Sequence, residues 1–481
     1  MNFRCRKLVL SLAAVGLMPT TVVANTLQLS QESAGEVLIY PYYTVRNGTI
    51  SLLSLVNGSN DAKAVRLRVR EAIGGRTVAE LNVFLSPKDV WTAAIVPTTD
   101  GATIVSNDKS CTHPKISGGN AGLVFSSAGF ASDDAAYSPY TPADRTREGY
   151  VEVIEMASVE YGTALGKDIT HVAGVAACKL TGDPSSAAIQ STLAVPSGGL
   201  FGGMSFINLN DGISVSYNAT AVNGFWKTGP GAPVPTITAP LSPSAANPAS
   251  APDLTSGGNA TITVTDKGKT YVSTFARSID AMSALFMTST ISAEYATTAD
   301  GTFGATLVVT SPTKPYYIYG ESPRPFENLY EPAFGKGACD NYEVNATDRD
   351  EFFPASYETD QLCDVAAVLG LSPGPFTAFN SPRVRAINSM QAAGVHVAVP
   401  GKEGGYLEIQ PTYANAQLIP TNSSVLTRSA ASGALEWVSA THTYVGLPMI
   451  GFVLSVSKYK VGAPQQNFGN LNPLGTRRNI R

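Results

Sequence analysis

Charge is scarce in this 481-residue chain, because Asp, Glu, Lys and Arg together make up only 15% of the residues, against roughly 25% in ordinary soluble domains. The formal net charge is −4, which excludes the strongly basic surface on which general nucleic-acid binding depends. We therefore expect no nucleic-acid partner. Ser, Thr, Gly, Ala and Asn take the polar positions instead, a composition typical of exported β-proteins.

Apolar runs long enough for a membrane helix are also lacking, since a span needs about 18 or more continuous apolar residues. One shorter run at residues 8–18 follows basic residues at positions 4–7 and precedes a small-residue cleavage site before Asn25. This order is typical of a secretory signal peptide. We expect residues 1–24 to be removed, and the mature protein, without a transmembrane segment, to be extracytoplasmic, at the cell surface or secreted.

Cysteine is rare as well, and one of the five, Cys5, lies in the predicted signal peptide. The remaining four are an even set in an exported chain, which is typical of disulfides. We predict the bridges Cys111–Cys178 and Cys339–Cys363, the simplest of three connectivities. A metal site is the alternative, but these cysteines show no CxxC spacing.

Strong catalytic motifs are absent too. No serine lies in a GxSxG turn, and none of the four histidines forms an HxxH, HxH or HExxH unit. Glu152 and Glu155 are the nearest pair of carboxylates for glycoside hydrolysis, but their i, i+3 spacing puts them on opposite faces of a strand unless a bulge intervenes. We predict no catalytic residue and no cofactor, although sandwich enzymes also assemble sites from residues far apart in sequence.

What the chain does contain is a succession of strand patterns. The early ones are separated by turn residues and are expected at Glu36–Arg46, Thr49–Asn57, Lys63–Ala72, Arg76–Leu85 and Lys88–Val96. A later one is expected at Ile450–Tyr459. Asn47-Gly48 predicts a hairpin between the first two. Pro41 cannot donate to a ladder, so the first strand is expected at a sheet edge or with a bulge. Short helices are predicted within Val159–Val172 and Ala281–Tyr295.

The segment Lys63–Ala72 has a regular alternation, in which apolar residues occupy every second position and arginines lie between them at Arg66, Arg68 and Arg70. A period of two predicts a strand with one buried face and one face in water, as in an antiparallel sandwich.

Residues 229–258 contain seven prolines and almost no charge, which predicts an extended loop or linker. We expect a β-sandwich domain at 25–228, a second β-rich domain at 259–465 and a basic, flexible tail at 466–481. The alternative is one large sandwich with a long surface excursion.

Acidic residues are densest between Asp340 and Asp364. Asp340, Asp348 and Asp350 are candidate calcium ligands, because Ca²⁺ prefers clustered carboxylates and carbonyls. The segment lacks the spacing and the central glycine of an EF-hand loop, so a solvated loop is the alternative.

Tyrosines cluster twice, once around Pro41 and once after Pro315, at Tyr40, Tyr42, Tyr43, Tyr316, Tyr317 and Tyr319. Exposed tyrosines stack on sugar rings and anchor protein interfaces. The clusters therefore predict a glycan or protein partner, with a place in a sandwich core or edge as the alternative.

The block from Val37 to Ile95, with its hairpin patterns, alternating central strand and Trp91-bearing strand, resembles an immunoglobulin-like module. Together with the YPYYT motif at 40–44 and the closing stretch at 446–452, it is similar to largely uncharacterised proteobacterial exported cell-surface proteins. The resemblance implies an all-β fold of immunoglobulin-like antiparallel sandwiches and a surface location. It supplies no catalytic residues.

We therefore expect an exported cell-surface or secreted structural or adhesive protein, whose partners are itself, other surface proteins or glycans. In a self-assembling form, residues 25–36 would donate a strand to a neighbouring copy. The alternative is a carbohydrate-binding or carbohydrate-active protein, with Glu152 as the residue to test in a hydrolase.

Overall fold

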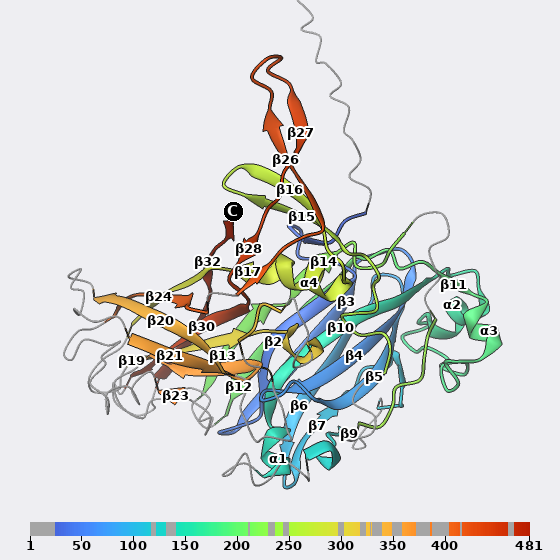
Figure 1. The fold of residues 1–481 in the computed structure, drawn as a ribbon. Helices are drawn as coiled ribbons and strands as arrows, with labels where there is room; N and C mark the ends of the chain where they lie inside the picture. Colours follow the sequence, from blue (N-terminus) through green and yellow to red (C-terminus); the bar gives the residue numbers. More distant parts are fainter. Residues whose placement is uncertain are drawn as a thin grey trace, which may run out of the picture.

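The structure is a computed structural model (Figure 1), which describes residues 25–116, 122–130, 141–209, 212–228, 236–243, 250–296, 303–317, 324–327, 329, 339–348, 358–371, 385–386, 404–413, 416–459 and 466–481. The predicted signal peptide at residues 1–24 lies outside this part of the chain, as do Tyr319 and Asp350. The described chain is mostly β and forms several antiparallel sheets.

The first large sheet has eight strands in the order β1-β14-β2-β10-β4-β5-β8, with β11 paired to β10. Their bounds are β1 Gln28–Leu29, β2 Val37–Thr44, β4 Ala62–Glu71, β5 Thr77–Leu85, β8 Cys111–His113, β10 Glu148–Val159, β11 Leu193–Ala194 and β14 Thr220–Asn223. Strands β2, β4, β5 and β10 are buried at every position. This sheet is therefore an internal layer rather than an outer wall.

The second large sheet has six strands in the order β13-β12-β3-β6-β7-β9. Their bounds are β3 Thr49–Asn57, β6 Val90–Thr98, β7 Gly101–Val105, β9 Leu123–Val124, β12 Leu200–Asn208 and β13 Ile213–Asn218. Its inner face shares a hydrophobic cluster with the first sheet, in which Leu53 and Trp91 join Leu67 and Val153. Its outer positions are exposed or half-buried.

The later strands form smaller sheets, in the orders β15-β16-β26-β27, β21-β20-β24-β18-β32, β23-β22-β19-β30-β31, β25-β28-β33 and β17-β29. The bounds are β15 Thr261–Asp266, β16 Lys269–Thr274, β17 Met287–Thr288, β18 Thr290–Tyr295, β19 Phe303–Thr310, β20 Cys339–Asp348, β21 Glu358–Cys363, β22 Ala366–Gly370, β23 Arg385–Ala386, β24 Gly405–Pro411, β25 Gln417–Leu418, β26 Asn422–Arg428, β27 Leu435–Ser439, β28 Tyr444–Val445, β29 Leu447–Pro448, β30 Ile450–Tyr459, β31 Gln466–Pro473, β32 Gly475–Arg477 and β33 Asn479–Ile480. The hairpin of β26 and β27 projects from the body at the top of Figure 1.

Helices are short: α1 Pro142–Arg145, α2 Ala164–Ile169, α3 Ala187–Gln190, α4 Ser278–Phe286, and the 3₁₀ turns η1 Ala128–Phe130 and η2 Lys314–Tyr316. Helix α4 is buried from Ile279 to Phe286. Among the described residues, no helix has the length and apolar character needed to cross a membrane. The strands predicted at Thr49–Asn57 and Ile450–Tyr459 are confirmed with those bounds.

The hairpin predicted at Asn47-Gly48 is wrong. Both residues have the expected positive φ, 50° and 69°, but β2 pairs with β10 and β14, whereas β3 pairs with β6 and β12. The turn carries the chain from one sheet to the other, because each strand finds better partners far away in sequence. This strand order does not confirm an immunoglobulin-like topology.

Pro41 lies at a bulge, one of its two predicted settings. Tyr43 pairs with Gly149 and Tyr40 with Val151, so two residues of β2 stand opposite a single residue of β10. The proline therefore removes no regular ladder bond. The strand itself is internal and not at an edge.

Two other predictions are corrected. The helix predicted within Ala281–Tyr295 ends at Phe286 and gives way to strands β17 and β18, because the β-branched residues that follow favour extended backbone. The tail at 466–481, predicted to be flexible, forms β31, β32 and β33 in separate sheets.

The segment at residues 25–36, predicted to donate a strand to a neighbouring copy, is bound within its own chain. Strand β1 pairs with β14, and Leu27 is buried beside Ile262. It therefore offers no unpaired strand for donation.

The predicted Cys111–Cys178 disulfide is confirmed, and it joins β8 to the loop after α2 across 67 residues. Cys339 and Cys363 stand opposite each other in the register of β20 and β21. The side chain of Cys363 lies outside the described part of the chain, so the second bridge stays a prediction.

Removing the first bridge should destabilise the fold. We expect the double variant Cys111→Ser, Cys178→Ser to lose about 4 kcal/mol of unfolding free energy, because the unfolded chain regains the freedom of a loop of this length. Urea unfolding at constant pH measures the difference. A loss below about 1 kcal/mol would contradict this expectation.

Candidate functional site

The arginines of β4 do not face water, which corrects the prediction from their alternation. Arg66, Arg68 and Arg70, here called the arginine row, are 0%, 0% and 4% exposed. They lie on the outer face of the first sheet, opposite the face that carries Leu67 and Val69. The alternation correctly predicted two distinct faces of the strand. The second face, however, is covered by other parts of the protein and not by water.

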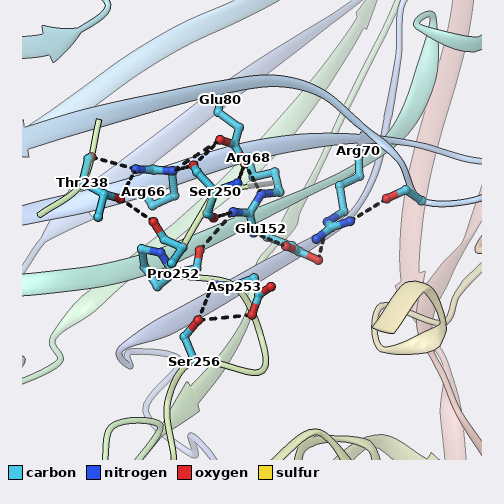
Figure 2. Close-up of polar contacts among 12 residues, drawn as sticks. Arg66, Arg68, Arg70, Glu80, Glu152, Thr238, Ser250, Pro252, Asp253 and Ser256 are labelled. Carbon is cyan, nitrogen blue, oxygen red and sulfur yellow. Dashed lines mark hydrogen bonds and ion pairs between the residues drawn. The ribbon is translucent and has the colours of Figure 1, made fainter. Parts of the chain in front are cut away.

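Carboxylates of the neighbouring strands pair with the arginine row (Figure 2). Glu80 on β5 and Glu152 on β10 both stand directly opposite Arg68. Arg68 Nε lies 2.6 Å from Glu80 Oε1, and Arg68 Nη1 lies 3.3 Å from Glu152 Oε2. Arg66 Nη1 reaches Glu80 at 3.3 Å, and Arg70 Nε reaches Glu152 at 2.8 Å. Three guanidiniums and two carboxylates thus alternate in one buried line.

This line carries one more positive than negative charge, and the proline-rich stretch supplies further hydrogen bonds to Arg66, Arg68 and Glu80. We call residues 236–243 and 250–256 the covering segment. Arg66 Nη2 donates to the carbonyl of Thr238 at 2.8 Å, and Arg68 Nη2 donates to that of Pro252 at 3.0 Å. Ser250 hydrogen-bonds Arg66, Arg68 and Glu80.

The composition of the covering segment suits this role. Proline has no N–H to donate, and extended backbone outside a ladder leaves its carbonyls free to accept. The segment is therefore rich in acceptors where the arginine row is rich in donors. Ile237 also joins Phe84 and Met156 in a second hydrophobic cluster with helices α2 and α3, which covers the adjoining part of this face.

Tyr316 closes the other end of the row. Its hydroxyl donates to Glu152 Oε2 at 2.9 Å, and the guanidinium of Arg70 lies over its ring at 4.7 Å. Arg70 Nη1 also donates to the carbonyl of Gly75 at 2.6 Å. Each charged group in the row thus has several partners, as buried charges require.

The electrostatics of the row follow from burial and from these pairings. Burial, together with the like charge of Arg68, lowers the pKa of Arg66 to about 10, so Arg66 stays charged at neutral pH. For Glu80, burial favours the neutral acid, but the charges of Arg68 and Arg66 prevail and hold its pKa below the usual range. Both groups are therefore ionised in the folded protein.

Glu155 lies on the opposite face from Glu152, as predicted from the spacing. Its Oε1 is 2.7 Å from Lys63 Nζ, which also donates to Ser158 at 2.8 Å and to Ser197 at 2.7 Å. The side chains of Lys63 and both glutamates are fully buried. Neither carboxylate lies where a polysaccharide could reach it. Both form buried ion pairs that connect neighbouring strands of the sheet.

Glu36 lies near this second cluster and accepts a hydrogen bond from the backbone N–H of Trp226 at 2.9 Å. Burial raises its pKa to about 7, with a smaller contribution from the negative charge of Glu155 and an opposing one from Lys63. The group is therefore half-protonated near neutral pH.

A Ser-His-Asp group not identified from the sequence lies at the end of α2. Ser86 Oγ is 2.7 Å from His171 Nδ1, and Asp89 Oδ2 is 3.6 Å from that same nitrogen. In a catalytic triad the hydroxyl and the carboxylate engage different ring nitrogens. Ser86 Oγ also contacts the carbonyl of Ile169, so this group fixes the helix end to the β5–β6 turn.

The predicted calcium ligands are not brought together. Asp340 is buried and lies 2.6 Å from Lys314 Nζ, which neutralises it. Asp340 and Asp348 lie near opposite ends of β20, about 26 Å apart at roughly 3.3 Å per residue. Asp350 lies outside the described residues. Within the described ranges, no three His, Cys, Asp or Glu side chains could hold a metal ion.

The tyrosine clusters are also not surface features. Tyr40, Tyr42 and Tyr43 are completely buried, Tyr317 is buried, and Tyr316 is half-buried against the arginine row. They fill the core, which was the alternative interpretation, and give no platform for a sugar.

Comparison with known proteins adds no relationship. No family model, curated protein or solved structure matches this chain. The resemblance to exported cell-surface proteins therefore remains an expectation.

Sequence reasoning missed the partners of the arginine row, namely Glu80, Thr238, Ser250 and Pro252. One signal was available: Glu80 and Glu152 each lie within a strand pattern otherwise rich in apolar residues, and isolated carboxylates there point to buried partners. The covering segment left no comparable signal, because its contacts use backbone carbonyls.

Breaking the ion pairs of the arginine row should lower the free energy of unfolding. We expect Arg68→Met to lower the unfolding free energy by about 3–5 kcal/mol, because Glu80 and Glu152 each lose a partner in the interior. Arg428→Met, at an exposed position, is the matched control and should change it by less than about 0.5 kcal/mol. Equal losses in the two variants, measured by urea unfolding, would show that the row is not structural.

Glu36 should make stability fall with rising pH. The pKa of Glu36 in the folded state is about 7, above its ordinary value of 4.5. Between these two pH values the folded state binds a proton that the unfolded state has lost, so the free energy of unfolding falls as pH rises from 4.5 through 7. Glu36→Gln lacks this titration, so its free energy of unfolding relative to that of the wild type should increase from pH 4.5 to pH 8, by up to about 3 kcal/mol. A constant difference in unfolding free energy across this range would refute the assignment.

Proposed function

We propose that this protein is an exported structural or adhesive protein that acts at the cell surface or in the surrounding medium through its β-sheet surface. The observation that carries the proposal is the distribution of charge over the two large sheets. The charged face of the first sheet is sealed by the chain's own covering segment, whereas the outer face of the second sheet is exposed and carries no charged side chain on β3, β6, β12 or β13.

Other features support the same role. The Cys111–Cys178 disulfide suits an oxidising compartment. Asn25, the first residue after the predicted cleavage site, already donates to the carbonyl of Trp226 and to Thr228. Cleavage before Asn25 would therefore leave the described fold intact. The division of strands β2 to β6 between two sheets is the basis for extending the proposal to an immunoglobulin-like relationship.

The carbohydrate alternative receives less support. Its proposed residue, Glu152, is buried in ion pairs, and four of the tyrosines proposed to stack on sugars, Tyr40, Tyr42, Tyr43 and Tyr317, are buried. We therefore propose the structural or adhesive role alone.

The location and the role can be tested together in the cells that make the protein. We expect its N-terminus to begin at Asn25, added protease to digest it on intact cells, and deletion of its gene to weaken adhesion or aggregation of those cells. A cytoplasmic protein should stay protected in the same experiment. A chain that keeps Met1 and remains in the cytoplasmic fraction would overturn the proposal.

A further inference from the structure

The outer face of the second large sheet is free of charge across four adjacent strands. We call the outward positions of β3, β6, β12 and β13 the uncharged face. All of them are apolar residues, Gly, Ser, Thr or Asn. Its large apolar side chains are well exposed, with Leu52 at 37%, Phe201 at 41% and Val90 at 50%.

The strand register gathers these side chains into continuous rows. Phe201 stands opposite Val56, which stands opposite Val90. Two rows along, Leu52 lies between Ser205 and Ala94 in the same way, and the row between the two consists of Gly203, Ser54 and Thr92. The exposed apolar side chains therefore lie in two rows of one face, separated by small uncharged residues.

The middle of the face is hollowed. Small side chains, including those of Ser54 and Ala94, line a hollow of about 350 Å³ bordered by Leu52, Thr92 and Val105. A hollow beside a projecting leucine can complement itself, because a two-fold axis brings the projection of each copy to the hollow of the other.

The face approaches the size of a small stable interface. It covers four strands about 4.8 Å apart, which have nine, nine, nine and six residues at roughly 3.3 Å each, or about 520 Å² in outline. The smallest standard interfaces bury about 600 Å² per partner. Two such faces would pack as sheets in a sandwich do, about 10 Å apart.

We propose that a second copy of this chain packs on the uncharged face and forms a two-fold sheet-to-sheet dimer. The inference rests on the proposed surface role and names the partner that the exposed sheet would take. A second copy suits the face because association would bury no unpaired charge and because the hollow and the projections belong to the same surface.

Other occupants fit less well. Sugars are held by aromatic rings together with charged or amide side chains that bond their hydroxyls, and the uncharged face offers Phe201 as its exposed aromatic ring and no charged group. A strongly acidic or basic partner would find no complementary charge. An identical apolar face avoids both difficulties.

The test measures the mass of the full mature chain by sedimentation over a range of concentrations. We expect the wild type to be a dimer, and Leu52→Lys to weaken dimerisation by about 100-fold or more, because it would replace the projecting leucine by an ammonium group that loses its water in the interface. Leu435→Lys, at an exposed strand position on β27, is the matched control and should leave the dimer unchanged. Leu52 is itself exposed, so both variants should fold, as circular dichroism and thermal unfolding will show.

A wild type that is monomeric at all concentrations would overturn the dimer, as would an assembly that persists unchanged in Leu52→Lys. These failures differ from failure of the proposed function. A monomer that protease still reaches on intact cells would remove the dimer and leave the surface role, whereas a cytoplasmic dimer would remove the surface role alone.

Discussion

The architecture depends on burying three guanidiniums on one strand. A charged group that is buried loses its hydrogen bonds to water, and protein groups must replace them. Removing even one of these partners is strongly destabilising. Glu80 and Glu152 supply part of that set from adjacent strands, and carbonyls of the covering segment supply the rest. The proline-rich stretch is therefore held on the sheet by the residues that most need it.

This constraint explains the layering of the molecule. Once the covering segment and Tyr316 lie over the arginine row, and α2 and α3 lie over the neighbouring apolar cluster, the first sheet has no solvent face. The second sheet then becomes an outer wall (Figure 1). Two sheets of similar strand length thus have opposite surroundings, because one has a covering segment and the other does not.

The distribution of charge is the reverse of the usual one. Antiparallel sheets commonly turn their apolar side inward and their charged side to water. Here the charged side of the first sheet is internal, and the exposed side of the second carries no charge. In a chain with so few charged residues, this leaves an exposed sheet face that could be covered without burying a charge, and the proposed role rests on this feature.

Local patterns predicted much of the strand layout and little of the candidate site. The runs around Leu53 and Val453 have the residue types and the turn boundaries of strands, and these signals do not depend on the rest of the chain. The bulge at Pro41 was also accessible, because a missing N–H has the same consequence in any sheet. The setting of Glu152 was not accessible, since its partners are Arg68 and Arg70 on another strand and Tyr316, which lies 164 residues further along the chain.

The sequence by itself determined the β class and the two faces of β4, because these follow from residue type and from a period of two. The even number of cysteines predicted disulfides, and the tertiary structure decided among three connectivities that Cys111 pairs with Cys178. Only the tertiary structure decided which faces of the sheets are exposed to water. Alternation distinguishes the two sides of a strand but carries no information about what another segment places on either side. That was settled by long-range packing, in which the acceptor-rich covering segment lies on Arg66 and Arg68 and leaves the face around Leu52 open.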